Sequence, residues 1–234
     1  MSRNFELLQQ AGWDEGMFSE APRPEPKEAS AKPTKPTWPR LSSSEMARFA
    51  RRVFLDSPPP APRVVVFSGL RRKVGCSKLC AFMARLLAEE AQQRVCAVDG
   101  NFGAPSLHVH FDSSNQPGLA EALLFGQPPG ELARQVSPES CWLLSYGQKR
   151  LNGQSGASSL GLRNCLDALR DQFDFVLVDS PSLSAGSQAI RFARCSDGAI
   201  LVADCQSTSA SEASNVKRQL DRARVPLLGV VMTN

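Results

Sequence analysis

The chain has 234 residues, of which 42% are hydrophobic and 21% charged, and its net charge is +4. A chain of this length buries a substantial core, and no apolar run approaches the ~18 residues that a membrane-spanning helix needs, so we expect a soluble globular protein. The N-terminus lacks the basic and apolar regions of a signal peptide. Because the seven cysteines are an odd number and scattered, we expect no disulfide framework and predict a cytoplasmic protein.

Proline divides the sequence, because ten of its 17 prolines precede residue 63. Residues 1–20 carry apolar side chains with a weak helical pattern, which fits a short docking helix or a partly ordered tail equally well. The run Ala21–Arg40 mixes proline with charges of both signs and predicts a disordered, extended linker over residues 21–41. Residues 42–62 are predicted to hold an amphipathic helix and a turn that pack on the main domain.

The predicted helix within residues 42–62 begins with a capping box formed by Ser42 and Glu45. It should run for about three turns, until the proline-rich run SPPPAP ends it. Its apolar residues recur at helical spacing and form one hydrophobic face: Met46, Phe49, Ala50, Val53 and Phe54.

From residue 63 onward, short runs of β-branched residues alternate with longer helical stretches, and apolar runs such as VVVF, FVLV and AILV indicate strands buried on both faces. We therefore predict that residues 63–234 form a doubly wound α/β domain, with a mostly parallel sheet and helices on both faces. The predicted strands are Val64–Ser68, Val95–Asp99, Trp142–Ser145, Phe175–Asp179, Ala199–Ala203 and Leu227–Met232. Helices are predicted to begin near Ser77, Gly118, Ala157, Gly186 and Thr208.

The turn after the first predicted strand is a candidate phosphate-binding loop. In such folds ligands bind beyond the carboxyl ends of the strands, where a glycine-bearing turn leads into a helix N-terminus. A P-loop needs GxxxxGK[ST], in which the lysine reaches the outer phosphates and the hydroxyl holds magnesium. The sequence keeps Gly75 and Ser77, but Cys76 stands at the lysine position and one additional residue separates Gly69 from Gly75. The motif alone fits an ordinary strand-to-helix turn equally well.

Four basic side chains crowd this turn and favour an anion as its ligand, with a solvated basic turn as the alternative: Arg71, Arg72, Lys73 and Lys78. Cys76 is interpreted as a small buried side chain rather than as a thiol with a lowered pKa. Asp99 and Asp179 each end a predicted buried strand, where a magnesium ion or an activated water would lie. For either aspartate alone, a helix cap or a turn is the alternative.

The glycine-bearing turn with Gly75 and Ser77 and the strand ends at Asp99 and Asp179 follow one another along the chain. In this order they resemble the bacterial tyrosine kinases (BY-kinases, CpsD/CapB-like), within the MinD/ParA class of P-loop ATPases. The resemblance covers about residues 42–234. The segment RVCAVDGNFGAPSLHVHF resembles the second Walker segment, with Asp99 at its first aspartate and Asn101 at its second. DFVLVDSPS resembles the Walker B strand and gives Asp179. Three residues match the ExxRxxR helix, which mediates ring-like oligomerisation in that family: Glu45, Arg48 and Arg51.

The resemblance implies ATP or ADP with Mg²⁺ as ligand, with Asp99 and Asp179 in catalytic positions. Arg71 stands roughly at the place of the family's additional signature lysine, and Asn234 stands where such ATPases contact adenine. The implied nucleotide-binding residues are Arg71, Arg72, Lys73, Gly75, Cys76, Ser77, Lys78 and Asn234, and the implied magnesium ligands are Ser77, Asp99 and Asp179. The implied partners are a membrane polysaccharide co-polymerase or export protein and further copies of the chain, at the inner face of the membrane.

Two departures from the family separate this chain from a working tyrosine autokinase. Cys76 removes the charge that tracks the transferred phosphoryl group, which costs a few kcal/mol and slows transfer about a thousandfold. Tyr146 is the only tyrosine, so the C-terminal tyrosine cluster of BY-kinases is missing. We expect a degenerate, regulatory protein of exopolysaccharide or capsule biosynthesis or export. The alternatives are an active ATPase or tyrosine kinase that uses another loop cation, and a MinD/ParA-like positioning or scaffold module.

For two further patterns we prefer the interpretation that assigns no ligand. His108 and His110 would face the same way on an extended segment and, with Asp112, suggest a metal site, but ordinary packing is preferred. The basic residues form no stripe interleaved with aromatic residues, so we expect no nucleic-acid partner.

Overall fold

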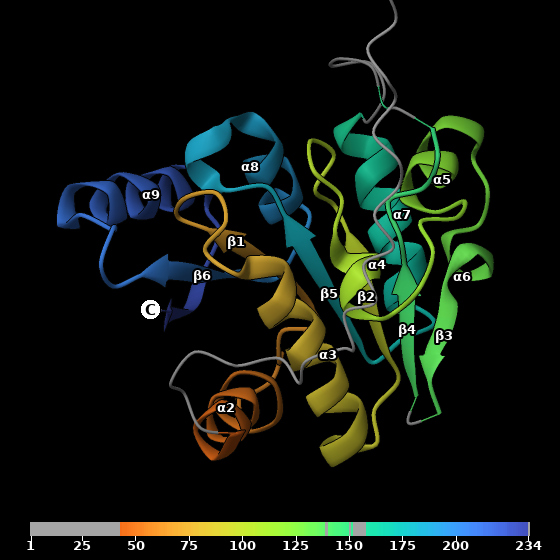
Figure 1. Ribbon diagram of the computed structural model, residues 1–234, viewed down its shortest axis with the longest axis horizontal. Coiled ribbons are helices and arrows are strands. Elements are labelled where there is room, and N and C mark those ends of the chain that lie inside the picture. Colours follow the sequence, from red (N-terminus) through yellow and green to blue (C-terminus); the bar gives the residue numbers. More distant parts are fainter. Residues whose placement is uncertain (1–42, 139, 150, 152–157, 234) are drawn as a thin grey trace, which may run out of the picture. The chain divides into compact units, whose positions relative to one another are not determined.

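The structure of the protein, a computed structural model, describes residues 43–138, 140–149, 151 and 158–233 (Figure 1). The chain divides into two units, Met1–Thr37 and Trp38–Asn234, and every described residue belongs to the second. The predictions for residues 1–20 and 21–41, for Ser42 and for Asn234 lie outside the described residues. The predicted domain boundaries therefore stay predictions.

A seven-stranded sheet forms the centre of the described unit, in the order β3-β4-β2-β5-β1-β6-β7 (Figure 1). Neighbouring strands are parallel except for the antiparallel pair of β3 and β4. The strands are β1 (Val64–Gly69), β2 (Val95–Asp99), β3 (Arg134–Ser137), β4 (Cys141–Leu144), β5 (Phe175–Ser180), β6 (Gly198–Asp204) and β7 (Leu227–Thr233). The predicted fold class is confirmed. Strand β3 was not predicted, because its sequence RQVS is short and exposed or half-buried and carries no apolar run.

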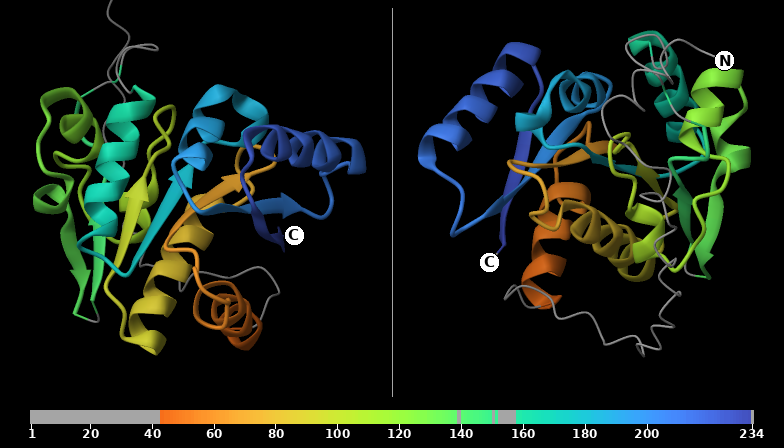
Figure 2. Two further views of the ribbon diagram at one scale, coloured as in Figure 1. Left: turned by 180° about the vertical axis from the view of Figure 1, so that it is seen from behind. Right: turned by 45° about the horizontal axis from the view of Figure 1, so that its top comes forward.

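Helices cover both faces of this sheet, as the views in Figure 2 show. They are α2 (Ser43–Ala50), η2 (Arg51–Leu55), α3 (Cys76–Ala91), α4 (Leu107–His110), α5 (Leu119–Phe125), α6 (Pro129–Leu132), α7 (Ser159–Arg170), η3 (Leu183–Ala185), α8 (Ser187–Arg194) and α9 (Ala210–Ala223). The five predicted helix starts lie within two residues of α3, α5, α7, α8 and α9. The short elements α4, α6 and η3 were not predicted, because three or four residues show no helical periodicity.

The central strand β1 is buried on both faces, as its unbroken apolar run predicts. Val65 and Phe67 pack in the core beneath α2 and α3, whereas Val64 and Val66 pack in the opposite core beneath α7. All four side chains are fully buried. Because the strand is covered on both sides, its carboxyl end is the part of it that opens toward a ligand.

The amphipathic helix predicted within residues 42–62 consists of the α-helix α2 followed by the π-helical turn η2. Its apolar face lies in the same core as α3, with Met46, Val53 and Phe54 buried. The ring of Phe49 lies against Gly229 of β7, where a Cβ atom would come within 2.7 Å of it. The predicted hydrophobic face is therefore confirmed. Among the described helices, none has both the length and the apolar composition that a membrane crossing requires.

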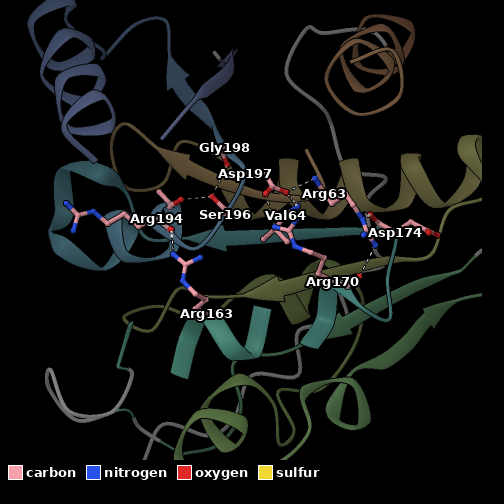
Figure 3. A network of polar contacts seen from close by, with 10 residues as sticks. Arg63, Val64, Arg163, Arg170, Asp174, Arg194, Ser196, Asp197 and Gly198 are labelled. Atoms are coloured by element: carbon pink, nitrogen blue, oxygen red, sulfur yellow. Dashed lines mark hydrogen bonds and ion pairs between the residues drawn. The ribbon is translucent and has the colours of Figure 1, made fainter. Parts of the chain in front are cut away.

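A polar network closes the end of the sheet where β1 begins (Figure 3). Asp197 Oδ2 accepts the backbone N–H groups of Arg63 and Val64, both at 2.8 Å, and Oδ1 accepts Arg170 Nη2 at 2.7 Å. The Arg63 guanidinium donates to the carbonyl oxygens of Arg170, Phe173 and Asp174 at the end of α7. Although burial raises the pKa of Asp197, its hydrogen bonds with Arg170 and the two backbone groups outweigh this and lower it. The network fixes β1 to α7 at the end of the strand away from the glycine-bearing turn.

Candidate functional site

A cavity of about 880 Å³ lies at the carboxyl ends of the central strands. Its wall comes from the turn after β1 and the start of α3, from the segment after β2, and from the segment between β5 and α8. It brings together the predicted loop residues Arg71, Arg72, Lys73, Gly75, Cys76, Ser77 and Lys78 with Asp179. Sequence reasoning did not assign other wall residues to this site, among them Ser106, His110, Ser182 and Gln188. Their one sequence signal is that they follow the two predicted strand-end aspartates.

The turn between β1 and α3 has the backbone of a phosphate-binding loop. Gly75 precedes the helix with φ +85°, and the first helical hydrogen bond runs from Leu79 N–H to the Gly75 carbonyl oxygen at 3.0 Å. The amides before Leu79 have no intrahelical acceptor, as at every helix start, and carry a partial positive charge. Gly69 is required by space, because a Cβ there would lie 2.5 Å from the Arg71 carbonyl oxygen. The backbone therefore suits an anion at this turn.

Asp179 is the most unusual side chain of the cavity. It is fully buried at the end of β5, and neither carboxylate oxygen accepts a well-formed hydrogen bond from the part of the chain that the structure describes. Burial and the nearby Asp99 raise its pKa to about 7, although the adjacent Ser77 hydroxyl and Cys76 thiol oppose this. A buried carboxylate is costly when its nearest donors, here the Ser77 hydroxyl and the Cys76 thiol, form no well-formed hydrogen bond with it, and Asp179 lines the cavity where a ligand would bind.

Cys76 stands beside Asp179 at the start of α3. Burial of the thiol, followed by the negative charge of Asp179, raises the pKa of Cys76 well above its usual value. Cys76 is half-buried, and the direction of this pKa shift favours the prediction of a small, unreactive side chain over that of a thiol activated by the helix N-terminus. The residue at the lysine position therefore brings a neutral group, not a cation, to the cavity.

Asp99 lies directly beside Asp179 on the neighbouring strand but does not line the cavity. The two residues are paired in register on β2 and β5. Asp99 is fully buried, and its oxygens accept the backbone N–H groups of Asn101 at 3.2 Å and Leu107 at 2.9 Å. Burial raises the pKa of Asp99 to about 6 against the effect of these donors. Asp99 therefore fixes the start of α4. The residue before this helix is Ser106, whose Oγ lies 3.1 Å from Ser77 Oγ.

The basic side chains of the turn differ in their surroundings. Arg71 Nε donates to Glu212 Oε1 of α9 at 2.8 Å and forms an ion pair with it. Hydrogen bonds from Ser209, then Arg71, lower the pKa of Glu212 to about 2. Arg72 and Lys73 are exposed, whereas Lys78 is half-buried in the first turn of α3. The predicted cluster therefore exists, but Arg71 is held by an acidic partner that the sequence did not indicate.

The histidines do not form the metal pair that we considered. The segment is the short helix α4, not an extended strand, so positions two apart do not face the same way. His110 lines the cavity, whereas the buried Nδ1 of His108 has no hydrogen-bond partner among the described residues. No cluster of three histidine, cysteine, aspartate or glutamate side chains suited to a metal occurs in the described part of the chain.

Tyr146 is buried just after the end of β4. Its side chain is 6% exposed, its hydroxyl oxygen accepts Leu151 N–H at 3.0 Å, and its ring packs against Phe102. Phosphorylation of Tyr146 would require this packing to open. The ExxRxxR residues lie elsewhere: Glu45, Arg48 and Arg51 are exposed on α2 and η2, and none of them lines the cavity.

The parallel sheet, the glycine turn and the strand-end aspartates define a P-loop NTPase fold of the MinD/ParA class. Solved structures confirm this fold. A chimerical protein, CapA2B2, superimposes with a TM-score of 0.74 at 23% identity over 81% of this chain and 83% of that chain. The septum site-determining protein MinD of Pyrococcus horikoshii OT3, complexed with Mg-ADP, superimposes with a TM-score of 0.62 at 20% identity over 72% of this chain and 68% of that one.

A family model described as cellulose biosynthesis protein BcsQ matches residues 63–226, and the chain belongs to this family. Curated relatives confirm the resemblance to bacterial tyrosine kinases. The tyrosine-protein kinase ptk of Acinetobacter johnsonii is 25% identical over 73% of this chain and 23% of its own length. The putative tyrosine-protein kinase CapB of Staphylococcus aureus is 25% identical over 68% of this chain and 69% of its own length. The chain thus spans about a quarter of the first relative and two thirds of the second.

Proposed function

We propose that the chain binds ATP or ADP with Mg²⁺ and acts as a nucleotide-dependent regulatory protein of exopolysaccharide synthesis or export. The buried, unpartnered Asp179 carboxylate at the wall of an 880 Å³ cavity carries this proposal. An ionised group in that place needs a cation or a hydrogen-bond donor, and a metal-bound nucleotide supplies both. The BcsQ family description supports cellulose as the polymer.

The residues of the cavity fit a magnesium nucleotide. The Ser77 hydroxyl and the Asp179 carboxylate offer oxygen ligands, which Mg²⁺ prefers, directly or through bound water. The amides at the start of α3 and the basic side chains of the turn suit the phosphates. When bound, magnesium neutralises phosphate charge. Asp99 contributes by holding the segment after β2 in place, since its oxygens accept backbone N–H groups.

The neutral thiol of Cys76 supports binding without efficient phosphoryl transfer. A neutral thiol does not stabilise the charge of the transferred phosphoryl group. The loss of this stabilisation raises the barrier by about a few kcal/mol, which slows transfer about a thousandfold. The buried Tyr146 offers no accessible acceptor in this fold. Nucleotide occupancy therefore serves as a signal. We propose that the exposed Glu45, Arg48 and Arg51 join copies of the chain into an oligomer in response to nucleotide. This oligomer binds a membrane polysaccharide co-polymerase at the inner face of the membrane.

Calorimetric titration with Mg-ATP and Mg-ADP tests the proposal. We expect micromolar binding to the wild type and loss of binding in Asp179→Ala. The matched variant Asp221→Ala, an exposed residue of α9 paired with Lys217, should bind as the wild type does. Absence of heat at high micromolar nucleotide would refute nucleotide binding. Rapid phosphate release that Asp179→Ala abolishes would instead favour an active ATPase and contradict the regulatory role.

A further inference from the structure

We infer that Lys78 replaces the missing P-loop lysine and contacts the phosphates of the bound nucleotide, with the His110 imidazole as a second contact from the facing helix α4. This inference rests on the proposed nucleotide binding and assigns the cation that makes it selective for phosphates. Both residues line the cavity that also contains the unpartnered Asp179 carboxylate.

The position of Lys78 in α3 directs its side chain toward the loop. It is the third residue of the helix, two positions after Cys76. Side chains in a helix lean toward the N-terminus, and Lys78 lines the cavity, so its ammonium group is within reach of a phosphate bound at the turn. An ordinary P-loop has its lysine at the position of Cys76, the first residue of this helix. Here the positive charge lies two residues later, on Lys78.

The other three basic residues of the wall are more exposed to water than Lys78. Arg71 is exposed and forms an ion pair with Glu212. Arg72 and Lys73 are exposed on the turn, where water screens their charges. Lys78 is half-buried, so its attraction for a phosphate is screened least among these four.

The facing residue His110 adds a hydrogen-bonding group without a charge. Burial, followed by the positive charges of Lys78 and Arg85, lowers its pKa, so the imidazole is neutral near pH 7. Arg85 Nη2 donates to the His110 carbonyl oxygen at 2.9 Å, and its guanidinium lies 5.0 Å from the centre of the Phe111 ring. Helix α3 therefore holds α4 against itself and presents Lys78 and His110 to the same space.

The test compares dissociation constants of Mg-ADP and Mg-ATP for Lys78→Met, Lys78→Arg and the control Lys149→Met, an exposed lysine outside the cavity. A charged hydrogen bond to phosphate predicts about 10- to 100-fold weaker binding for Lys78→Met. Lys78→Arg and the control should stay within about threefold of the wild type. The double variant Cys76→Lys with Lys78→Met should regain binding, because it returns the cation to the ordinary position.

The outcomes separate this inference from the proposed function. Wild-type binding that Lys78→Met leaves unchanged overturns the inference alone, whereas absence of wild-type binding overturns both. A second measurement needs no variant. The chain has two histidines, so their imidazole signals are readily assigned by nuclear magnetic resonance. Saturating Mg-ADP should shift the signal of His110 more than that of His108, and an unchanged His110 signal contradicts the inference even if Lys78→Met fails to fold.

Discussion

Replacing Asp179 with asparagine should stabilise the nucleotide-free protein while removing its affinity for Mg-ATP. The carboxylate is fully buried, and neither oxygen accepts a well-formed hydrogen bond from another described residue. Burial and Asp99 raise its pKa from 3.8 to about 7. An asparagine of nearly the same shape carries no charge, so the fold no longer holds a carboxyl group that would ionise in water.

The two pKa values set the size and the pH range of this effect. Below pH 3.8 the carboxyl group is protonated in the folded and the unfolded chain and costs nothing. Between that pH and about 7, only the unfolded chain ionises, so stability falls by about 1.4 kcal/mol per pH unit. Above this range the loss levels off at about 4 kcal/mol. Asparagine should recover about 2 to 4 kcal/mol of it, because its own buried amide has a smaller cost.

Urea unfolding in the presence of EDTA measures this difference. Near pH 8 the unfolding free energy of Asp179→Asn should exceed that of the wild type by about 2 to 4 kcal/mol, and near pH 4 the two should agree. Mg-ATP should then stabilise the wild type but not the variant. The control Asp221→Asn, whose side chain is 58% exposed, should change little at either pH. A variant no more stable than the wild type near pH 8 would refute the description of Asp179 as an unpartnered buried carboxylate.

Three further predictions concern the network, the loop and the missing lysine. Asp197→Ala should lower the unfolding free energy by about 3 kcal/mol near pH 7, since it removes three hydrogen bonds to a carboxylate; because the folded pKa is lowered, urea unfolding should show this difference shrinking as the pH falls through about 4, and an equal loss near pH 2 would contradict it. Gly69→Ala should weaken Mg-ATP binding in calorimetry at least about tenfold, because its Cβ would meet the Arg71 carbonyl oxygen at 2.5 Å, and unchanged affinity would show that the loop adjusts freely. Cys76→Lys should raise the rate of phosphate release by about tenfold or more, and a rate equal to that of the wild type would show that the lysine position does not limit transfer.

The sequence predicted the central strands well because their burial is a local pattern. An unbroken apolar run such as VVVF requires cover on both faces, and β1 has it. The antiparallel edge strand β3 escaped prediction since its pairing with β4 comes from tertiary contact, not from its own polar sequence. The extended segment assumed around His108 was wrong for the same reason. Helix α4 is fixed from outside by the Asp99 carboxylate and by Arg85, and four residues cannot signal this by themselves.

The sequence predicted residues of the candidate site, but not how each side chain is buried and hydrogen-bonded. The sequence placed Asp99 and Asp179 each at the end of a predicted buried strand, and the structure pairs these two strand ends in register. The sequence did not separate their surroundings, because only the folded chain shows that Asp99 accepts two backbone N–H groups while Asp179 accepts none in the described residues. The partner of Arg71 lies 141 residues further along the chain, a distance over which no local pattern indicates a contact.

The carboxylate of Glu212 divides its two oxygens between two structures. Oε2 accepts the Ser209 N–H and hydroxyl groups at 3.0 and 2.9 Å and closes the start of α9, whereas Oε1 alone accepts Arg71. A phosphate that draws Arg71 away would leave the bonds of Oε2 in place. A change of partner at Arg71 would therefore leave the hydrogen bonds that close the start of α9 unbroken, because the two contacts use different oxygens of Glu212.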